Sequence, residues 1–183
     1  MKSKKLPIVI LTVLVIIGFI IGFFAGGYNR LVKAQTNVET KQADIQTQLQ
    51  RRADLIPNFI ATVKGYTKYE QETLTAVTQA RASVSKATDG ESLSQASDQL
   101  DKAISVWVNA VTEAYPELKA NSNYIALQDE LAGTENRIAV ARKDYNEAVQ
   151  SYNTMIKTFP KNILAGMFNF EKAAFFTASD GAQ

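Results

Sequence analysis

The chain has 183 residues, with 20 basic and 18 acidic side chains, and it contains neither cysteine nor histidine. The missing residue types exclude disulfides, thiolate nucleophiles, imidazole bases and cysteine- or histidine-bound zinc. Three lysines precede residue 6, so the remainder carries 17 basic and 18 acidic groups. This balance is not typical of a nucleic-acid-binding surface. We therefore expect no nucleic-acid partner, no cofactor, no metal site and no catalytic residue.

Residues 6–27, LPIVILTVLVIIGFIIGFFAGG, form an unbroken apolar run after a basic leader at residues 1–5. As a helix this run would be about 33 Å long, enough to cross the hydrocarbon core of a bilayer. Its length favours a retained single-pass anchor over a cleaved signal peptide, whose apolar region is about 7–15 residues long. The compact leader favours a cytoplasmic N-terminus and a domain outside, although Arg30, Lys33 and Lys41 beyond the span nearly balance it.

Residues 28–160 show apolar positions that alternate in steps of three and four, the spacing of helices that pack along a seam. We expect the first helix to continue out of the span to about Arg51-Arg52. A second helix would cover 55–86, with Asp54 as its N-cap and Pro57 in its first turn. A third, capped by Ser92, would cover 93–114, and a fourth would end at Phe159-Pro160. Because no strand pattern appears, we predict an all-α fold, with an N-terminal transmembrane helix followed by an elongated antiparallel four-helix bundle.

Residues 161–183 form a C-terminal tail with an unusual number of aromatic side chains. An up-and-down bundle would return the end of its fourth helix, and therefore the start of this tail, to the bilayer surface. We favour a tail that packs in a groove of the bundle. Membrane contact at headgroup level and partner binding stay open as alternatives. The candidate contact residues are Met167, Phe168, Phe170, Phe175 and Phe176.

Charged and amide side chains interrupt the predicted seams at a few positions. If the chain turns near Ala53, antiparallel packing would bring these positions to similar heights, where a buried polar layer would fix the helix register. A polar pocket and exposed helix ends are the alternatives. The candidate layer consists of Gln35, Glu70, Arg81 and Arg142. The fourth helix also carries a wider polar cluster of Glu135, Arg137, Arg142, Asn146 and Asn153.

The chain resembles the LemA family over nearly its whole length. The matching segments are YNRLV at 28–32, RADLIPN at 52–58, VKGY at 63–66, YPELKAN at 115–121, TENRIA at 134–139 and ARKDYN at 141–146. Two positions depart from the family pattern, Gln42 where a tryptophan is expected and Asn169 where a glycine is expected. The resemblance implies a single-pass bacterial membrane protein with a four-helix-bundle domain and no established enzymatic activity.

Family members look like membrane-tethered accessory or scaffold proteins, sometimes associated with membrane proteases or envelope stress. For this chain the resemblance predicts a non-catalytic scaffold or adaptor that holds partner proteins at the bacterial cell membrane. The alternative is a protein that acts on the lipid interface itself, in envelope remodelling or stress. The sequence identifies neither the partner nor the oligomeric state, and it leaves homo-oligomer formation open.

Overall fold

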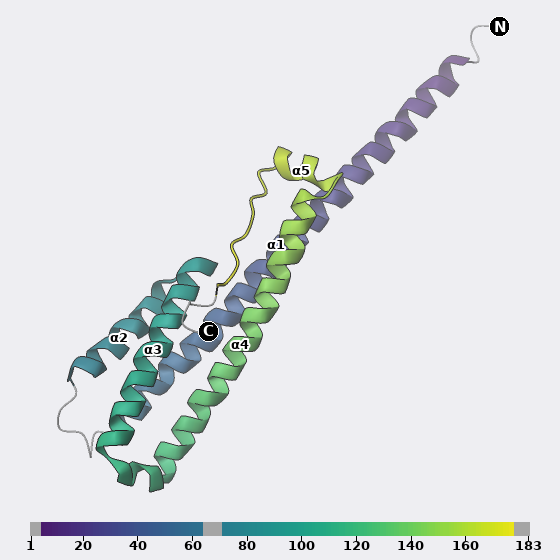
Figure 1. The fold of residues 1–183 in the computed structure, drawn as a ribbon. Helices are drawn as coiled ribbons and strands as arrows, with labels where there is room; N and C mark the ends of the chain where they lie inside the picture. Colours follow the sequence, from purple (N-terminus) through teal and green to yellow (C-terminus); the bar gives the residue numbers. More distant parts are fainter. Residues whose placement is uncertain (1–4, 64–70, 178–183) are drawn as a thin grey trace.

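The computed structural model describes residues 5–63 and 71–177, and within these ranges the chain is helical without any strand. This confirms the all-α prediction. A bundle of helices lies at one end of the molecule, and one helix projects far beyond it (Figure 1). The elements in chain order are α1 (Lys5–Val63), α2 (Gln71–Lys86), α3 (Gly90–Ala114), the short 3₁₀ helix η1 (Pro116–Ala120), α4 (Ser122–Lys157) and α5 (Lys161–Met167).

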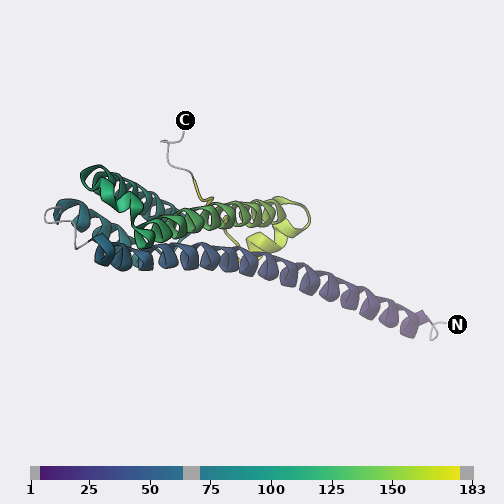
Figure 2. The same ribbon diagram turned by 90° about the horizontal axis from the view of Figure 1, so that it is seen from below.

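The helix α1 is a single element of 59 residues that runs from the apolar segment into the bundle. The two ribbon views agree that it continues without interruption (Figures 1 and 2). The expected break near Arg51-Arg52, with Asp54 as a cap, is therefore wrong. Pro57 lies inside the helix on its exposed side. The buried side chains on the opposite face continue past this proline and pack in the core, which outweighs the backbone hydrogen bond that proline cannot make.

The same error moves the start of the second helix. Residues that were expected to begin it belong to α1, and α2 is described from Gln71 onward. The third helix agrees with expectation except at its cap. Asp89, not Ser92, is the N-cap, and Ser92 completes a capping box by hydrogen bonding back to the backbone of Asp89. The pair satisfies two backbone N–H groups at the start of α3.

The helix α4 spans 36 residues and packs against α1, while α3 packs against α2 (Figure 1). Its predicted seam is buried from Tyr124 to Tyr152, except where Leu127 and Ala141 are partly covered. Phe159, the last residue of that seam, is instead 75% exposed. The core of the bundle therefore ends before α4 does, and the connection to α5 lies outside it.

The N-terminal part of α1 is the candidate membrane span. Among the described residues, α1 alone contains a stretch long and apolar enough to cross a membrane, and no part of that stretch is buried in the fold. Its side chains, such as Phe19 at 76% exposure, face outward on all sides. A helix that is apolar all round and uncovered by protein is suited to a lipid environment.

Candidate functional site

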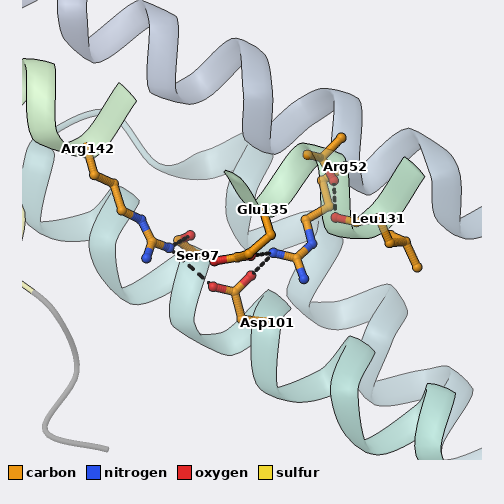
Figure 3. Close-up of polar contacts among 7 residues, drawn as sticks. Arg52, Ser97, Asp101, Leu131, Glu135 and Arg142 are labelled. Carbon is orange, nitrogen blue, oxygen red and sulfur yellow. Dashed lines mark hydrogen bonds and ion pairs between the residues drawn. The ribbon is translucent and has the colours of Figure 1, made fainter. Parts of the chain in front are cut away.

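A network of charged side chains lies inside the bundle, where α1, α3 and α4 meet (Figure 3). Arg52 of α1 donates one hydrogen bond to Asp101 of α3 and another to Glu135 of α4. Arg142, two helical turns beyond Glu135 on α4, donates to the second carboxylate oxygen of Asp101 at 3.2 Å and to the hydroxyl of Ser97. Two positive and two negative groups thus neutralise one another across three helices.

The burial of Arg52 makes this network costly to disrupt. Its side chain is only 7% exposed, whereas those of Asp101 and Arg142 are 24% and 21% exposed. Burial lowers the pKa of the Arg52 guanidinium, Asp101 opposes that shift, and the nearby Arg142 adds to it. Since arginine stays charged in proteins, the result is a buried cation that depends on its carboxylate partners. The arrangement fixes the relative positions of the helices and offers no obvious reaction chemistry.

The predicted polar layer is only partly related to this network. Gln35 is exposed and donates to Glu39, one turn away on the same helix. Arg81, with a side chain 41% exposed, donates to Asp54 at 3.2 Å. Of the described candidates, Arg142 joins the network, and Glu70 lies outside the described residues. The predicted alignment assumed a turn near Ala53, and because α1 passes through that position the assumed heights do not apply.

Two members of the network, Arg52 and Asp101, were missing from the predicted layer. Arg52 looked like a cation at a helix end, which it is not, because α1 continues beyond it. A signal for the other lay in α3, where Ser97 and Asp101 are four residues apart and therefore share a face. That face also holds the buried Leu100 and Ile104 close by. Glu135 had been noted only as part of the polar cluster on the fourth helix.

A second group of residues surrounds the point where α1 leaves the bundle. The short helix α5 packs there, and Gly27 leaves room for it: a Cβ atom on Gly27 would lie 2.5 Å from Cδ1 of Leu164. A hollow of about 310 Å³ lies beside this contact, between the α1 residues Gly22 to Arg30 and the first turn of α5. The ring of Phe168 lies 4.8 Å from that of Tyr28. The start of the tail is therefore held against the end of the apolar run.

The aromatic candidates of the tail have different environments. Phe176 is buried, and the guanidinium of Arg142 lies 4.8 Å from its ring centroid. Phe170 is partly buried, with its ring 5.9 Å from that of Tyr28. Met167, Phe168 and Phe175 are 63%, 52% and 46% exposed. The tail thus packs on the bundle at some positions and presents apolar side chains at others.

Residues 173–177 of the tail are held in place by polar side chains of α3 and α4. Asn153 exchanges two hydrogen bonds with the backbone of Ala173, and Asn146 does the same with Phe176. The hydroxyl of Tyr145 donates to the carbonyl of Ala174 at 2.9 Å. Two asparagines of the predicted polar cluster are therefore tail-binding residues, a role that the sequence did not indicate.

Within the described parts of the chain, no three histidine, cysteine, aspartate or glutamate side chains gather so as to hold a metal ion. The clustered carboxylates Asp101 and Glu135 are already paired with guanidinium groups. The described geometry thus provides two features that bear on function, a charged network inside the bundle and a tail that begins at the apolar helix.

Comparison with known proteins agrees with this architecture. The sequence model of the LemA family matches residues 41–183. The chain belongs to the LemA family. Protein LemA of Metamycoplasma hominis is 30% identical over 172 residues, which cover 93% of this chain and 78% of that protein. Magnetosome protein MamQ 2 of Paramagnetospirillum magneticum is 24% identical, with 92% and 71% covered, and MamQ of Magnetospirillum gryphiswaldense is 21% identical, with 81% and 64% covered.

The structure accounts for the two departures from the LemA pattern. Gln42 donates to the carbonyl of Thr88 at 2.8 Å, and so connects α1 to the turn between α2 and α3. Asn169 has a φ of 54°, in the left-handed region that glycine adopts most easily. Asparagine tolerates this conformation better than most other residues. The turn after α5 is therefore kept in this LemA-family chain although the expected glycine is absent.

Proposed function

We propose that this LemA-family protein is a non-catalytic scaffold that holds partner proteins at the bacterial cell membrane, with a single membrane span and the bundle outside the cytoplasm. The observation that carries the proposal is the continuity of α1. One helix includes both the apolar run and the residues Leu31 to Val63 that form part of the bundle core. A continuous helix ties the bundle to the span without a flexible linker, as a tethered scaffold requires.

The sidedness of the bundle is tested with single cysteines in this cysteine-free chain. Ser85 on α2 and Gln95 on α3 are exposed, so Ser85→Cys and Gln95→Cys place a thiol on the bundle without opening the core. A membrane-impermeant maleimide is applied to intact cells and, in parallel, to lysed cells. Labelling of intact cells is expected. Labelling only after lysis would place the bundle in the cytoplasm and overturn the proposed orientation.

The scaffold role is tested at the same exposed positions with photo-crosslinking side chains in living cells. A scaffold is expected to give a discrete crosslinked band of constant size at Ser85 or Gln95. Diffuse crosslinking at both positions, in cells where the protein is inserted and folded, would contradict it.

A second candidate function is direct action on the lipid interface. Phe159, Ile163 and Met167 are spaced four residues apart and are 75%, 50% and 63% exposed. They lie on and just before α5, next to the end of the apolar run (Figure 2). Exposed apolar side chains at that level are suited to the headgroup region of a bilayer.

Depth-dependent quenching separates this candidate from a scaffold whose tail stays in water. A bimane fluorophore is attached at Met167→Cys, or at Val140→Cys on α4, which is 61% exposed and lies well inside the bundle region. In vesicles that contain brominated lipids, contact with the bilayer is expected to quench bimane at position 167 but not at position 140. Equal fluorescence at both sites would remove the lipid-contact candidate.

A further inference from the structure

The tail of this protein occupies a site that recognises extended main chain. Asn153 accepts from the N–H of Ala173 at 3.0 Å and donates to its carbonyl at 2.9 Å. Asn146 accepts from the N–H of Phe176 at 2.8 Å and donates to its carbonyl at 2.9 Å. Each side-chain amide therefore pairs with both backbone groups of one residue, as a neighbouring β-strand would.

The spacing of the two asparagines fits an extended ligand. They are seven residues apart on α4, so they share a face and lie about 10.5 Å apart along the helix axis. Ala173 and Phe176 are three residues apart, which corresponds to about 10 Å in an extended chain. The repeat of the helix and the repeat of the ligand therefore match. Any chain of the same conformation and direction would find its backbone groups at the same positions.

Two more side chains complete the recognition of the backbone. Tyr145 donates to the carbonyl of Ala174, and Ser94 of α3 donates to the carbonyl of Thr177 at 2.6 Å. On the ligand side, Phe176 is the buried anchor, whereas Ala174 and Phe175 are exposed. The site thus reads main chain at four residues and one aromatic side chain. Both Asn153 and Ser94 are buried, at 9% and 3% exposure, so water competes poorly for these hydrogen bonds.

The tail is attached through an exposed connection. Phe168, Asn169, Glu171 and Lys172 are all exposed, and the chain after α5 has no regular secondary structure. Such a connection can redirect the tail without disturbing the bundle core. Exchange of an identical segment between copies is a low-cost route to association, because the exchanged contacts are the same as the original ones.

We propose that the groove formed by α3 and α4 is a peptide-binding site whose ligand in trans is the tail, residues 173–177, of a neighbouring copy. The sequence that fits the site is present on every copy. The inference rests on the proposed membrane anchoring in one respect: copies anchored by α1 stand at the same height and in the same direction above the bilayer. Each tail is then already level with its neighbour's groove, and confinement to a membrane raises its effective concentration.

The absence of cysteine from the chain permits a direct test. Two differently tagged full-length copies are co-expressed, one with Ser94→Cys in the groove and the other with Thr177→Cys in the tail. A short bis-maleimide is added to the membranes, and crosslinked heterodimer is measured. A matched control replaces Ser94→Cys by Val106→Cys, which is exposed on α3 twelve residues away. We expect at least about tenfold more heterodimer from position 94 than from position 106.

The asparagines make the expected result asymmetric. Asn146→Leu with Asn153→Leu in the groove copy should abolish the heterodimer, because its site no longer binds a tail. The same pair of substitutions in the tail copy should increase the heterodimer severalfold, because that copy releases its own tail. Phe176→Ala in the tail copy gives a second measurement that leaves both grooves intact, and it should reduce the heterodimer.

Heterodimer at the level of the position 106 control, while Ser94→Cys and Thr177→Cys in one chain crosslink within it, would overturn the inference. So would a heterodimer that does not depend on which copy carries the asparagine substitutions. The thiol-labelling experiment at Ser85 reports anchoring and sidedness independently. Failure of exchange in a protein that is correctly inserted is therefore distinguishable from failure of the proposed membrane scaffold.

Discussion

Substitution of Asp101 by alanine is the most direct test of the buried charged network. Asp101 pairs with Arg52 through one carboxylate oxygen and with Arg142 through the other. Asp101→Ala leaves Arg52, whose side chain is 7% exposed, with Glu135 as its remaining acidic partner. Removal of one partner from a buried pair costs about 3–5 kcal/mol, because an uncompensated charge is left behind. We expect the lower end, about 3 kcal/mol, since Glu135 stays.

The second contact adds little to this value. Arg142 and Asp101 are 21% and 24% exposed, so water screens that pair and can rehydrate the guanidinium. The measurement is urea unfolding of the full-length protein in detergent micelles, followed by helical circular dichroism. With a slope of about 2 kcal/mol per molar urea, a loss of about 3 kcal/mol lowers the midpoint by about 1.5 M.

Asp54→Ala provides a matched control, because Asp54 also pairs with an arginine of another helix. Its partner Arg81 lies on α2, and the two side chains are 55% and 41% exposed. An exposed pair of this kind contributes about 0.2–1 kcal/mol. The two aspartate substitutions should therefore differ by about 2 kcal/mol or more. Equal midpoints for both variants would show that burial of Arg52 does not set the stability, and would refute the reasoning.

Three further predictions concern a cap, a close contact and a turn. Hydrogen bonds from Ser92 lower the pKa of Asp89 in the folded chain, so this carboxylate stabilises folding above its unfolded pKa of 3.8 and the contribution is lost as the pH falls through the lower folded value. Asp89→Asn should flatten acid unfolding below pH 3.8 in a pH titration of stability, and an unchanged acid limb would contradict this. Gly27→Leu should displace α5 and speed amide exchange at residues 161–168, whereas Gly26→Leu, which meets nothing within 4 Å, should not; equal exchange in both would exclude a close contact. Asn169→Val should cost about 1–2 kcal/mol in urea unfolding because φ is 54°, and Asn169→Gly should cost almost nothing; equal stability would argue against the left-handed turn.

Much of the fold could be predicted because each helix carries its own periodic signal. The regular seam of α4 gave the correct extent of that helix, and the pair Tyr115-Pro116 marked the end of α3. The break near Asp54 failed because a proline and two arginines are local signals. They cannot reveal that Ala53, Ile56 and Phe59 pack continuously on one face of α1. Local stop signals were outweighed by core packing that is visible only in three dimensions.

The candidate site could be predicted less well, for a different reason. Register between helices depends on connection lengths, and an error of one turn changes which polar residues meet. Arg142 was correctly expected near other polar groups, but its partners Ser97 and Asp101 follow from the observed height of α3 beside α4. Backbone recognition by Asn146 and Asn153 leaves no mark in the tail sequence, because the amides contact main chain that every residue possesses.

The continuity of α1 and the charged network together determine what the bundle can transmit. Arg52 lies 25 residues beyond Gly27, which corresponds to about 37 Å along a helix. At that distance from the apolar run, its guanidinium bonds to both α3 and α4. A helix that merely passed the bundle could slide or rotate along it, whereas a buried cation with two acceptors fixes one position. A change in the height or rotation of the span must therefore move α4, and with it the asparagines that hold the tail, or else break the network. The tail-binding groove is in this way mechanically connected to the membrane end of the molecule.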